Sequence, residues 1–148
     1  MSAVTSSSNS LLDTNVLSEY RKPDANAGVL DFLRRAEFRS CYLSVITLCE
    51  IRFGVERLAR GRRRQELDHW LSWDLPLDFG DRILNVYDAI ADVAGHILAR
   101  AMRAGRPMGV MDAFLAATAQ VHGLTLVTRN TKDFETWGGP VFNPWVDA

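Results

Sequence analysis

The chain has 148 residues, 47% of them apolar, and a formal net charge of −1. This length favours one domain with a buried core, so we expect a single domain over residues 1–148 with a flexible tail at residues 1–9. The near-zero charge excludes a protein that binds nucleic acid through its overall field, so such binding needs a local patch. No apolar run is long enough to span a membrane, and the first residues do not resemble a signal peptide. Cys41 and Cys49 lack the spacing of a zinc site or a disulfide framework, which favours a reducing, cytoplasmic location.

Apolar spacing and turn residues predict alternating strands and helices along the chain. The predicted strands are residues 11–12, 41–46, 82–87, 124–128 and 141–142. The predicted helices are residues 16–20, a helix capped by Asp24, then residues 47–58, 63–73, 88–104 and 110–122, with residues 75–80 as a connection. Gly123 is expected to end the last helix in the C′ position. Residues 82–87 fit the start of a helix equally well.

This alternation is typical of an α/β protein with a parallel sheet. The helical segments are long enough to serve as crossover connections between parallel strands. The strands are short and strongly apolar, as burial on both faces requires. We therefore predict a three-layer α/β/α fold with a central parallel sheet of about four to five short strands.

Four acidic residues stand at predicted strand ends or helix starts. They are Asp13 after the first strand, Glu50 and Asp112 in the first turns of two helices, and Asp133 after the strand at 124–128. Because the carboxyl ends of parallel strands share one edge, these carboxylates would gather and repel one another unless a cation lay between them. Oxygen ligands select Mg²⁺ or Mn²⁺, and such a site suits phosphodiester hydrolysis by metal-activated water.

Each acid also has a purely structural interpretation. Asp13 can cap the helix that follows it. Thr47 and Glu50 have the spacing of a capping box, with Thr47 at the N-cap. Asp112 can be a favourable charge at a helix N-terminus, and Asp133 can cap a turn. Spacing alone therefore leaves both interpretations of the acids open.

Four ordered segments resemble the motifs of PIN-domain ribonucleases, and in particular the VapC/FitB toxins of type II toxin–antitoxin modules. The segments are 11–18 (LLDTNVLS), 44–50 (SVITLCE), 111–119 (MDAFLAATA) and 126–130 (LVTRN). Any one of them is weak evidence, whereas the ordered set is specific. The similarity spans the chain from Leu11 to Trp145.

The resemblance implies a PIN-like fold and a Mg²⁺-dependent endoribonuclease acting as a toxin, with Mn²⁺ as a possible substitute. It implies catalytic carboxylates at Asp13, Glu50 and Asp112, with Asp13 and Asp112 tied most directly to the metal. Asn15 and Thr128 match positions that give polar support to the acids. The implied partners are an RNA substrate, a VapB/FitA-like antitoxin and, by analogy, a second copy in a homodimer, with no membrane.

The chain departs from the family at the fourth acidic position. Many relatives have an acid directly after the Thr-Arg pair, where Asn130 stands here. Asn130 can position a water or a ligand but carries no charge, and Asp133 is close enough in sequence to substitute. Among the arginines, Arg52 and Arg129 lie nearest the acids in sequence, so we expect them to contact RNA phosphate. The densest basic cluster, residues 57–64, fits either a phosphate-binding patch or a solvated helix end.

Two other functions remain open from the sequence. A signalling receiver domain also has an acidic, Mg²⁺-binding pocket at strand ends, and Thr128 and Lys132 resemble its switch residues. A receiver needs adjacent acids near the first strand, however, and Asp13 stands alone there. The second alternative is a PIN-like domain that binds RNA without cutting it.

Overall fold

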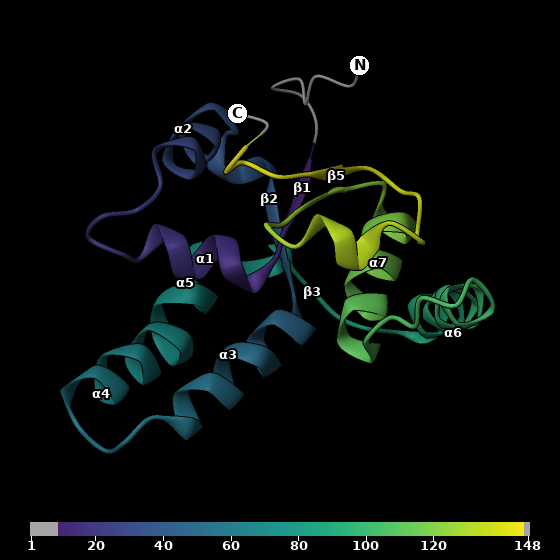
Figure 1. Ribbon diagram of the computed structural model, residues 1–148. Coiled ribbons are helices and arrows are strands. Elements are labelled where there is room, and N and C mark those ends of the chain that lie inside the picture. The colour runs from purple at the N-terminus through teal and green to yellow at the C-terminus, as the bar shows by residue number, and fades with distance from the viewer. Residues whose placement is uncertain (1–8, 147–148) are drawn as a thin grey trace.

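The computed structural model describes residues 9–146 (Figure 1). The expected tail therefore lies almost wholly outside the described residues, except for Asn9, whose carbonyl accepts a hydrogen bond from the Thr125 amide at 3.0 Å. Within residues 9–146, no helix has the length and apolar content needed to cross a bilayer.

Five strands within residues 9–146 form one parallel sheet. They are β1 (Ser10–Leu12), β2 (Cys41–Ser44), β3 (Ile83–Leu84), β4 (Thr125–Val127) and β5 (Val141–Phe142). Their order across the sheet is β3-β2-β1-β4-β5, and every neighbouring pair is parallel. The predicted parallel sheet of short strands is thus confirmed. The order also excludes the receiver alternative, because a flavodoxin-like receiver places β3, not β4, beside β1.

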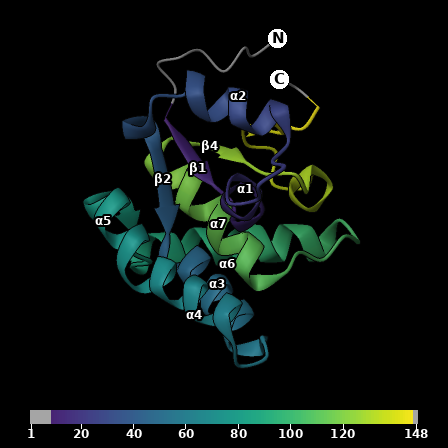
Figure 2. The ribbon, with the colours of Figure 1, turned by 90° about the vertical axis from the view of Figure 1, so that its left-hand side faces the viewer.

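In the described part of the chain, seven α-helices connect and flank these strands. They are α1 (Thr14–Tyr20), α2 (Ala27–Arg35), α3 (Val45–Arg57), α4 (Arg62–His69), α5 (Leu75–Phe79), α6 (Asp88–Arg103) and α7 (Val110–His122). Four short helical turns complete the described part: η1 (Phe38–Ser40), η2 (Trp70–Asp74), η3 (Gly80–Arg82) and η4 (Thr131–Phe134). Figures 1 and 2 show α6 and α7 on the opposite side of the sheet from α1, α2, α4 and α5.

The core has two parts because side chains alternate across the central strand. Leu11 is fully buried against α6 and α7, together with Leu115 and Phe134. The next residue, Leu12, points to the other side and packs with residues of α1 to α5, among them Val16. Burial on both faces confirms the three-layer architecture.

The local signals for α7 are borne out. The helix begins at Val110 and ends at His122, and Gly123 follows in the left-handed region with φ 65°. That conformation costs glycine little because it has no Cβ.

The strands predicted at residues 41–46 and 82–87 end earlier, at Ser44 and Leu84, and the helix predicted at residues 16–20 begins at Thr14. Three further predicted boundaries were wrong. The first helix after β2 begins at Val45 rather than Thr47, because the Ser44 hydroxyl accepts a hydrogen bond from the Ile46 amide and caps it. The proposed capping box of Thr47 and Glu50 therefore does not exist, since both lie inside the helix. The second helix is capped by Asn26 rather than Asp24, because the Asn26 side chain accepts from the amides of Gly28 and Val29.

The third wrong boundary concerns residues 75–80, which we expected to be a connection. Residues 62–79 instead run on as α4, a single π-type segment at Trp70–Asp74, and α5. Pro76 lies in the first turn of α5, directly after the π-type segment, so its missing amide hydrogen falls where the hydrogen-bond pattern changes between the two segments. Leu75 and Phe79 anchor this helix in the core.

Candidate active site

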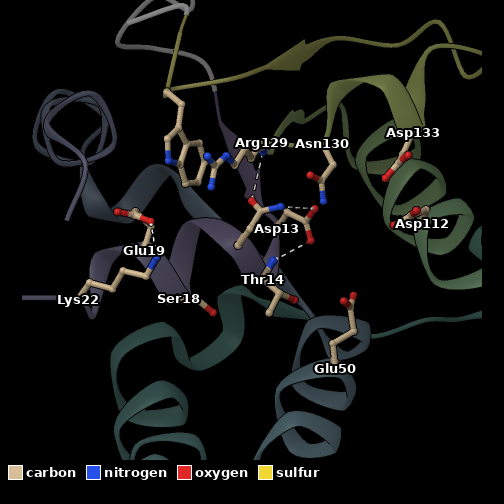
Figure 3. A pocket seen from close by; sticks show the side chains of 12 residues that line it. Asp13, Thr14, Ser18, Glu19, Lys22, Glu50, Asp112, Arg129, Asn130 and Asp133 are labelled. Carbon is tan, nitrogen blue, oxygen red and sulfur yellow. Dashed lines mark hydrogen bonds and ion pairs between the residues drawn. The ribbon is translucent and has the colours of Figure 1, made fainter. Parts of the chain in front are cut away.

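A pocket of about 420 Å³ opens at the carboxyl ends of β1 and β4. The strand order reverses between these two neighbours, which is where α/β sheets form ligand-binding crevices. Its lining residues are Asp13, Thr14, Asn15, Ser18, Glu19, Lys22, Glu50, Asp112, Arg129, Asn130, Asp133 and Trp145 (Figure 3). All four acids that we predicted as catalytic therefore line one pocket, although they come from four separate segments.

Asp13 is the most firmly held of these acids. It caps α1, with Oδ1 accepting from the Thr14 amide at 2.7 Å. Its Oδ2 accepts from the Thr128 hydroxyl at 2.8 Å and from the Asn15 amide group at 3.4 Å. The side chain is only 6% exposed, and this burial raises its pKa above the usual range despite the three hydrogen bonds. Asp13 therefore caps α1 and lines the pocket at the same time, so its structural interpretation does not exclude a role in the site.

Thr128 and Asn15 join the ends of β1 and β4. The Thr128 hydroxyl accepts from Asn15 Nδ2 at 3.3 Å and from the Asn130 amide at 3.1 Å while it donates to Asp13. Asn15 Oδ1 in turn accepts from the Arg129 amide at 3.2 Å. This network of hydrogen bonds holds the chain after β4 against Asp13.

Glu50 and Asp112 approach Asp13 from α3 and α7. Glu50 lies in the second turn of α3, and its carboxyl group points toward the space between Asp13 and Asp112 (Figure 3). Burial raises the pKa of Glu50 to about 7, and the charges of Asp13 and Asp112 contribute to the same shift. Burial likewise raises the pKa of Asp112 to about 6, with smaller contributions from Asp13 and Asp133. These mutual shifts indicate that the acids interact across one space.

Asn130 and Asp133 are the two candidates for the fourth position of the site. Both side chains line the pocket, with Asn130 just before η4 and Asp133 inside it. The short turn is closed by the Asp133 amide, which donates to the Asn130 carbonyl at 3.1 Å. Asp133 is near enough to raise the pKa of both Asp13 and Asp112. Asp133 thus adds an acidic side chain to the pocket, near Asp13 and Asp112.

The donor set fits a hydrated hard cation better than a fully enclosed one. Within residues 9–146, no three histidine, cysteine or acidic side chains stand close enough to surround an ion by themselves. Mg²⁺, however, keeps several waters and needs only one or two carboxylates. Glu50 Oε1 is buried and has no hydrogen-bond partner among the described residues, so it is free to accept from such a water. The Thr14 hydroxyl lies near Glu50 and slightly lowers its pKa, but the two groups do not form a hydrogen bond. Within the described residues, the Thr14 hydroxyl likewise has no hydrogen-bond partner.

Arg52 does not lie in this pocket. It is two residues beyond Glu50 on α3, so it points to a different side of the helix. Its guanidinium pairs with Asp68 at 2.7 Å and donates to Ser72 Oγ at 3.2 Å. Arg129, by contrast, lines the acidic pocket.

The basic cluster at residues 57–64 also lies elsewhere. Arg60 and Arg64 line a separate pocket of about 250 Å³ between α3 and α4. Arg64 is paired with Glu56, and Arg62 with Glu66 at 3.2 Å. The structure therefore favours the solvated helix end for this cluster.

The sequence reasoning missed five lining residues: Thr14, Ser18, Glu19, Lys22 and Trp145. A signal for the first two was present, because Thr14 and Ser18 are four residues apart and share one side of α1. Glu19 and Lys22 pair at 3.1 Å, and Glu19 also accepts the Asn26 amide at 2.8 Å. These hydrogen bonds hold the pKa of Glu19 below its usual range. Nothing in the sequence indicated that Trp145, far along the chain, returns to this pocket.

The chain belongs to the PIN-domain family, whose model, described as "PIN domain", matches residues 10–137. Within this family it groups with the VapC and FitB proteins that the sequence resembled. It is 38% identical to plasmid stability protein StbB of Pseudomonas syringae pv. tomato, over 91% of this chain and 97% of that protein. It is 37% identical to toxin FitB of Neisseria gonorrhoeae, over 93% and 99%, and 35% identical to VapC ribonuclease Y4jK of Sinorhizobium fredii, over 93% and 99%.

Solved complexes share the fold. The structure of FitAB bound to an IR36 DNA fragment has a TM-score of 0.84 and 36% identity, covering 91% of this chain and 94% of that one. A toxin–antitoxin complex from Klebsiella pneumoniae has a TM-score of 0.62 and 29% identity, covering 92% and 98%.

Proposed function

We propose that this protein is a metal-dependent endoribonuclease and the toxin of a VapBC/FitAB-type toxin–antitoxin module. The observation that carries the proposal is the convergence of Asp13, Glu50, Asp112 and Asp133 on one pocket, where burial and mutual repulsion raise the pKa of three of them. Such a cluster becomes favourable when a cation neutralises it. The similarity to a VapC ribonuclease supports RNA as the substrate. An RNA target is in keeping with a cytoplasmic site of action.

The chain's own residues have distinct roles in this proposal. Asp13 and Asp112 hold Mg²⁺, for which Mn²⁺ can substitute because it also prefers oxygen ligands. Bound at this position, the ion would supply an activated water and neutralise charge on the leaving oxygen. Glu50 orients the attacking water through its unpartnered Oε1. Asp133 adds negative charge, and Asn130 offers an amide that can hold water or a phosphate oxygen.

The partner in this proposal is an antitoxin, as in the toxin–antitoxin complexes that share the fold. An apolar groove of about 370 Å³ offers a surface for it, apart from the acids. The groove is lined by residues of α1, α2, η2 and α5, including Tyr20, Leu30, Leu33, Trp70 and Phe79. Exposed apolar surface of this kind typically marks a protein contact. A homodimer is proposed by analogy with the family.

Cleavage of total RNA tests the catalytic proposal. Purified wild type should produce discrete cleavage ends with Mg²⁺ and none with EDTA. Asp13→Asn and Asp112→Asn should each lower the rate by at least about a hundredfold, the scale expected when a group that stabilises the transition state is removed. Asp92→Asn is the matched control, because Asp92 is an exposed acid on α6 outside the pocket.

Full Mg²⁺-dependent cleavage by Asp13→Asn would contradict the proposal. RNA binding by wild type without any cleavage would instead favour the alternative of a non-cleaving RNA-binding domain. In cells, expression should arrest growth, and co-expression of the cognate antitoxin should relieve the arrest.

A further inference from the structure

The pocket has a basic side that the proposed hydrolysis leaves without a role. Figure 3 shows Lys22 and Arg129 on one side of Asp13, with Asp112 and Asp133 on the other. The acidic side alone would repel a polyanion such as RNA. The cations therefore lie where they can offset that repulsion, next to the acids and within the same opening.

Arg129 is held in place from three directions. Its amide donates to Asn15 Oδ1 at 3.2 Å, and its carbonyl accepts from Asn143 Nδ2 at 3.3 Å. Its guanidinium lies over the Trp145 ring, 5.3 Å from the ring centroid. Asn143 Oδ1 also accepts from the Trp145 amide at 2.9 Å, so one side chain fixes both partners of the stack. Because its position is pre-organised, Arg129 loses little conformational entropy when it binds a ligand.

The charge of Arg129 is available to a ligand. Among residues 9–146, its guanidinium forms no ion pair, and Arg129 is exposed at the pocket wall. The Glu19 carboxylate lies near enough for Arg129 to help lower the pKa of Glu19, but it is already hydrogen-bonded to Lys22 and to the Asn26 amide. Stacking on an indole leaves the edge of the guanidinium, with its N–H donors, open to an anion. Since Arg129 covers the ring, Trp145 has less surface on which a base could stack. The geometry thus favours a charge contact over base recognition.

Lys22 extends the basic side just beyond the C-terminal end of α1. Thr14 and Ser18, one helical turn apart, line the pocket between the acids and Lys22. Four helical residues advance about 6 Å, so these two polar side chains form a short path from Asp13 toward Lys22. Lys22 forms an ion pair with Glu19, but the Glu19 carboxylate also accepts a hydrogen bond from the Asn26 amide. The Lys22 side chain is 56% exposed, so its ammonium group can also reach a ligand.

We propose that Arg129 and Lys22 form a phosphate subsite for single-stranded RNA, next to the acids. The subsite binds a phosphodiester group that flanks the one being cut, and Trp145 and Asn143 position Arg129 for it. This inference rests on the proposed ribonuclease function, since it takes the acids as the place of cleavage. Phosphate contacts fix the register of a strand without reading its bases, so the subsite adds affinity for any sequence.

A neutral-linkage scan tests the subsite. Short RNA oligonucleotides carry one uncharged methylphosphonate at successive positions, and both binding and cleavage are measured with Mg²⁺. For wild type, neutralising the flanking linkage should weaken binding and raise KM about tenfold, with kcat changed less than about threefold. In Arg129→Ala, which should itself bind unmodified RNA about tenfold more weakly, the same neutral linkage should have little further effect. Lys22→Ala should show a smaller version of this loss.

Two measurements separate positioning from simple structural damage. Trp145→Leu should resemble Arg129→Ala in the scan, whereas Trp145→Phe keeps a ring under the guanidinium and should retain most of the affinity. The salt dependence of binding should fall by about 0.7 log unit per log unit of salt in Arg129→Ala, as for one lost phosphate contact on a single strand. Arg103→Ala, which removes an exposed arginine on α6, should behave as wild type.

The outcomes distinguish the two proposals. Binding with the predicted positional pattern but without cleavage would refute the ribonuclease function and keep the phosphate subsite. Equal penalties from the neutral linkage in wild type and Arg129→Ala would overturn the subsite even if cleavage is normal. Unchanged RNA affinity in Arg129→Ala together with lost antitoxin binding would also overturn it, and would assign the basic side to the protein partner. If Trp145→Leu kept the KM of the wild type, Trp145 would have no role in positioning Arg129.

Discussion

Glu50 should make the metal-free protein less stable as pH rises. Its pKa is raised to about 7 in the folded protein from 4.5, so the folded state holds the proton more tightly than the unfolded state. The resulting penalty is absent below pH 4.5 and complete above about pH 7. At about 1.4 kcal/mol per pKa unit the ceiling is ~3 kcal/mol. Because Glu50 is only partly buried, we expect roughly half of that, about 1.5 kcal/mol.

Glu50→Gln isolates this effect, because it keeps the shape of the side chain and removes its charge. In EDTA, urea unfolding at pH 8.5 should show the variant to be more stable than wild type by about 1.5 kcal/mol, and at pH 4.5 the two should agree within about 0.5 kcal/mol. Glu66→Gln is the matched control, since Glu66 is an exposed glutamate on α4 and should change stability little at either pH. A variant that is equally stable or less stable than wild type at pH 8.5 would refute the electrostatic reasoning.

Three further results follow from the site and its supports. Adding Mg²⁺ at pH 8 should raise the Tm of wild type through ligand linkage, and a thermal scan of Asp13→Asn should show a much smaller rise. Thr128→Val should cost about 1–3 kcal/mol in denaturant unfolding and lower RNA cleavage, because it leaves Asp13 without its shortest side-chain donor; unchanged stability and rate would contradict this role. Ser44→Ala should cost about 1 kcal/mol through the lost helix cap, whereas Thr47→Val should be neutral or stabilising, because the buried Thr47 hydroxyl has no hydrogen-bond partner in the described part of the chain. If Thr47→Val were instead more destabilising than Ser44→Ala, the result would support Thr47 as the helix cap and contradict the cap at Ser44.

The sequence predicts the fold well where a local signal and the tertiary structure agree. The helix at Val110–His122 combines an apolar pattern with Gly123 at its end, and its predicted bounds match the structure. The acids after β1 and β4 were also foreseeable, because parallel strands bring their carboxyl ends to one edge. Their roles in catalysis stay predictions until the variants are measured.

The errors arose where two local signals compete. Ser44 and Thr47 can both cap a helix, and the β-branched Val45 and Ile46 favour a strand by propensity, yet both belong to α3. At residues 75–80, Pro76 suggests a break, but the buried side chains around it keep the helix going. Arg52 was expected beside the acids because it is close to Glu50 in sequence, although residues two apart on a helix point to different sides. No short-range pattern brings Trp145 back to Asp13.

The two outermost strands of the sheet, β3 and β5, are each only two residues long. An unpaired strand edge is a template onto which another polypeptide can add by backbone hydrogen bonding, and its strength grows with the number of open amides and carbonyls. Edges this short offer almost nothing to such an addition. A second copy or a binding partner must therefore engage the side chains of the surrounding helices, so specificity in assembly depends on amino-acid identity rather than on generic strand pairing.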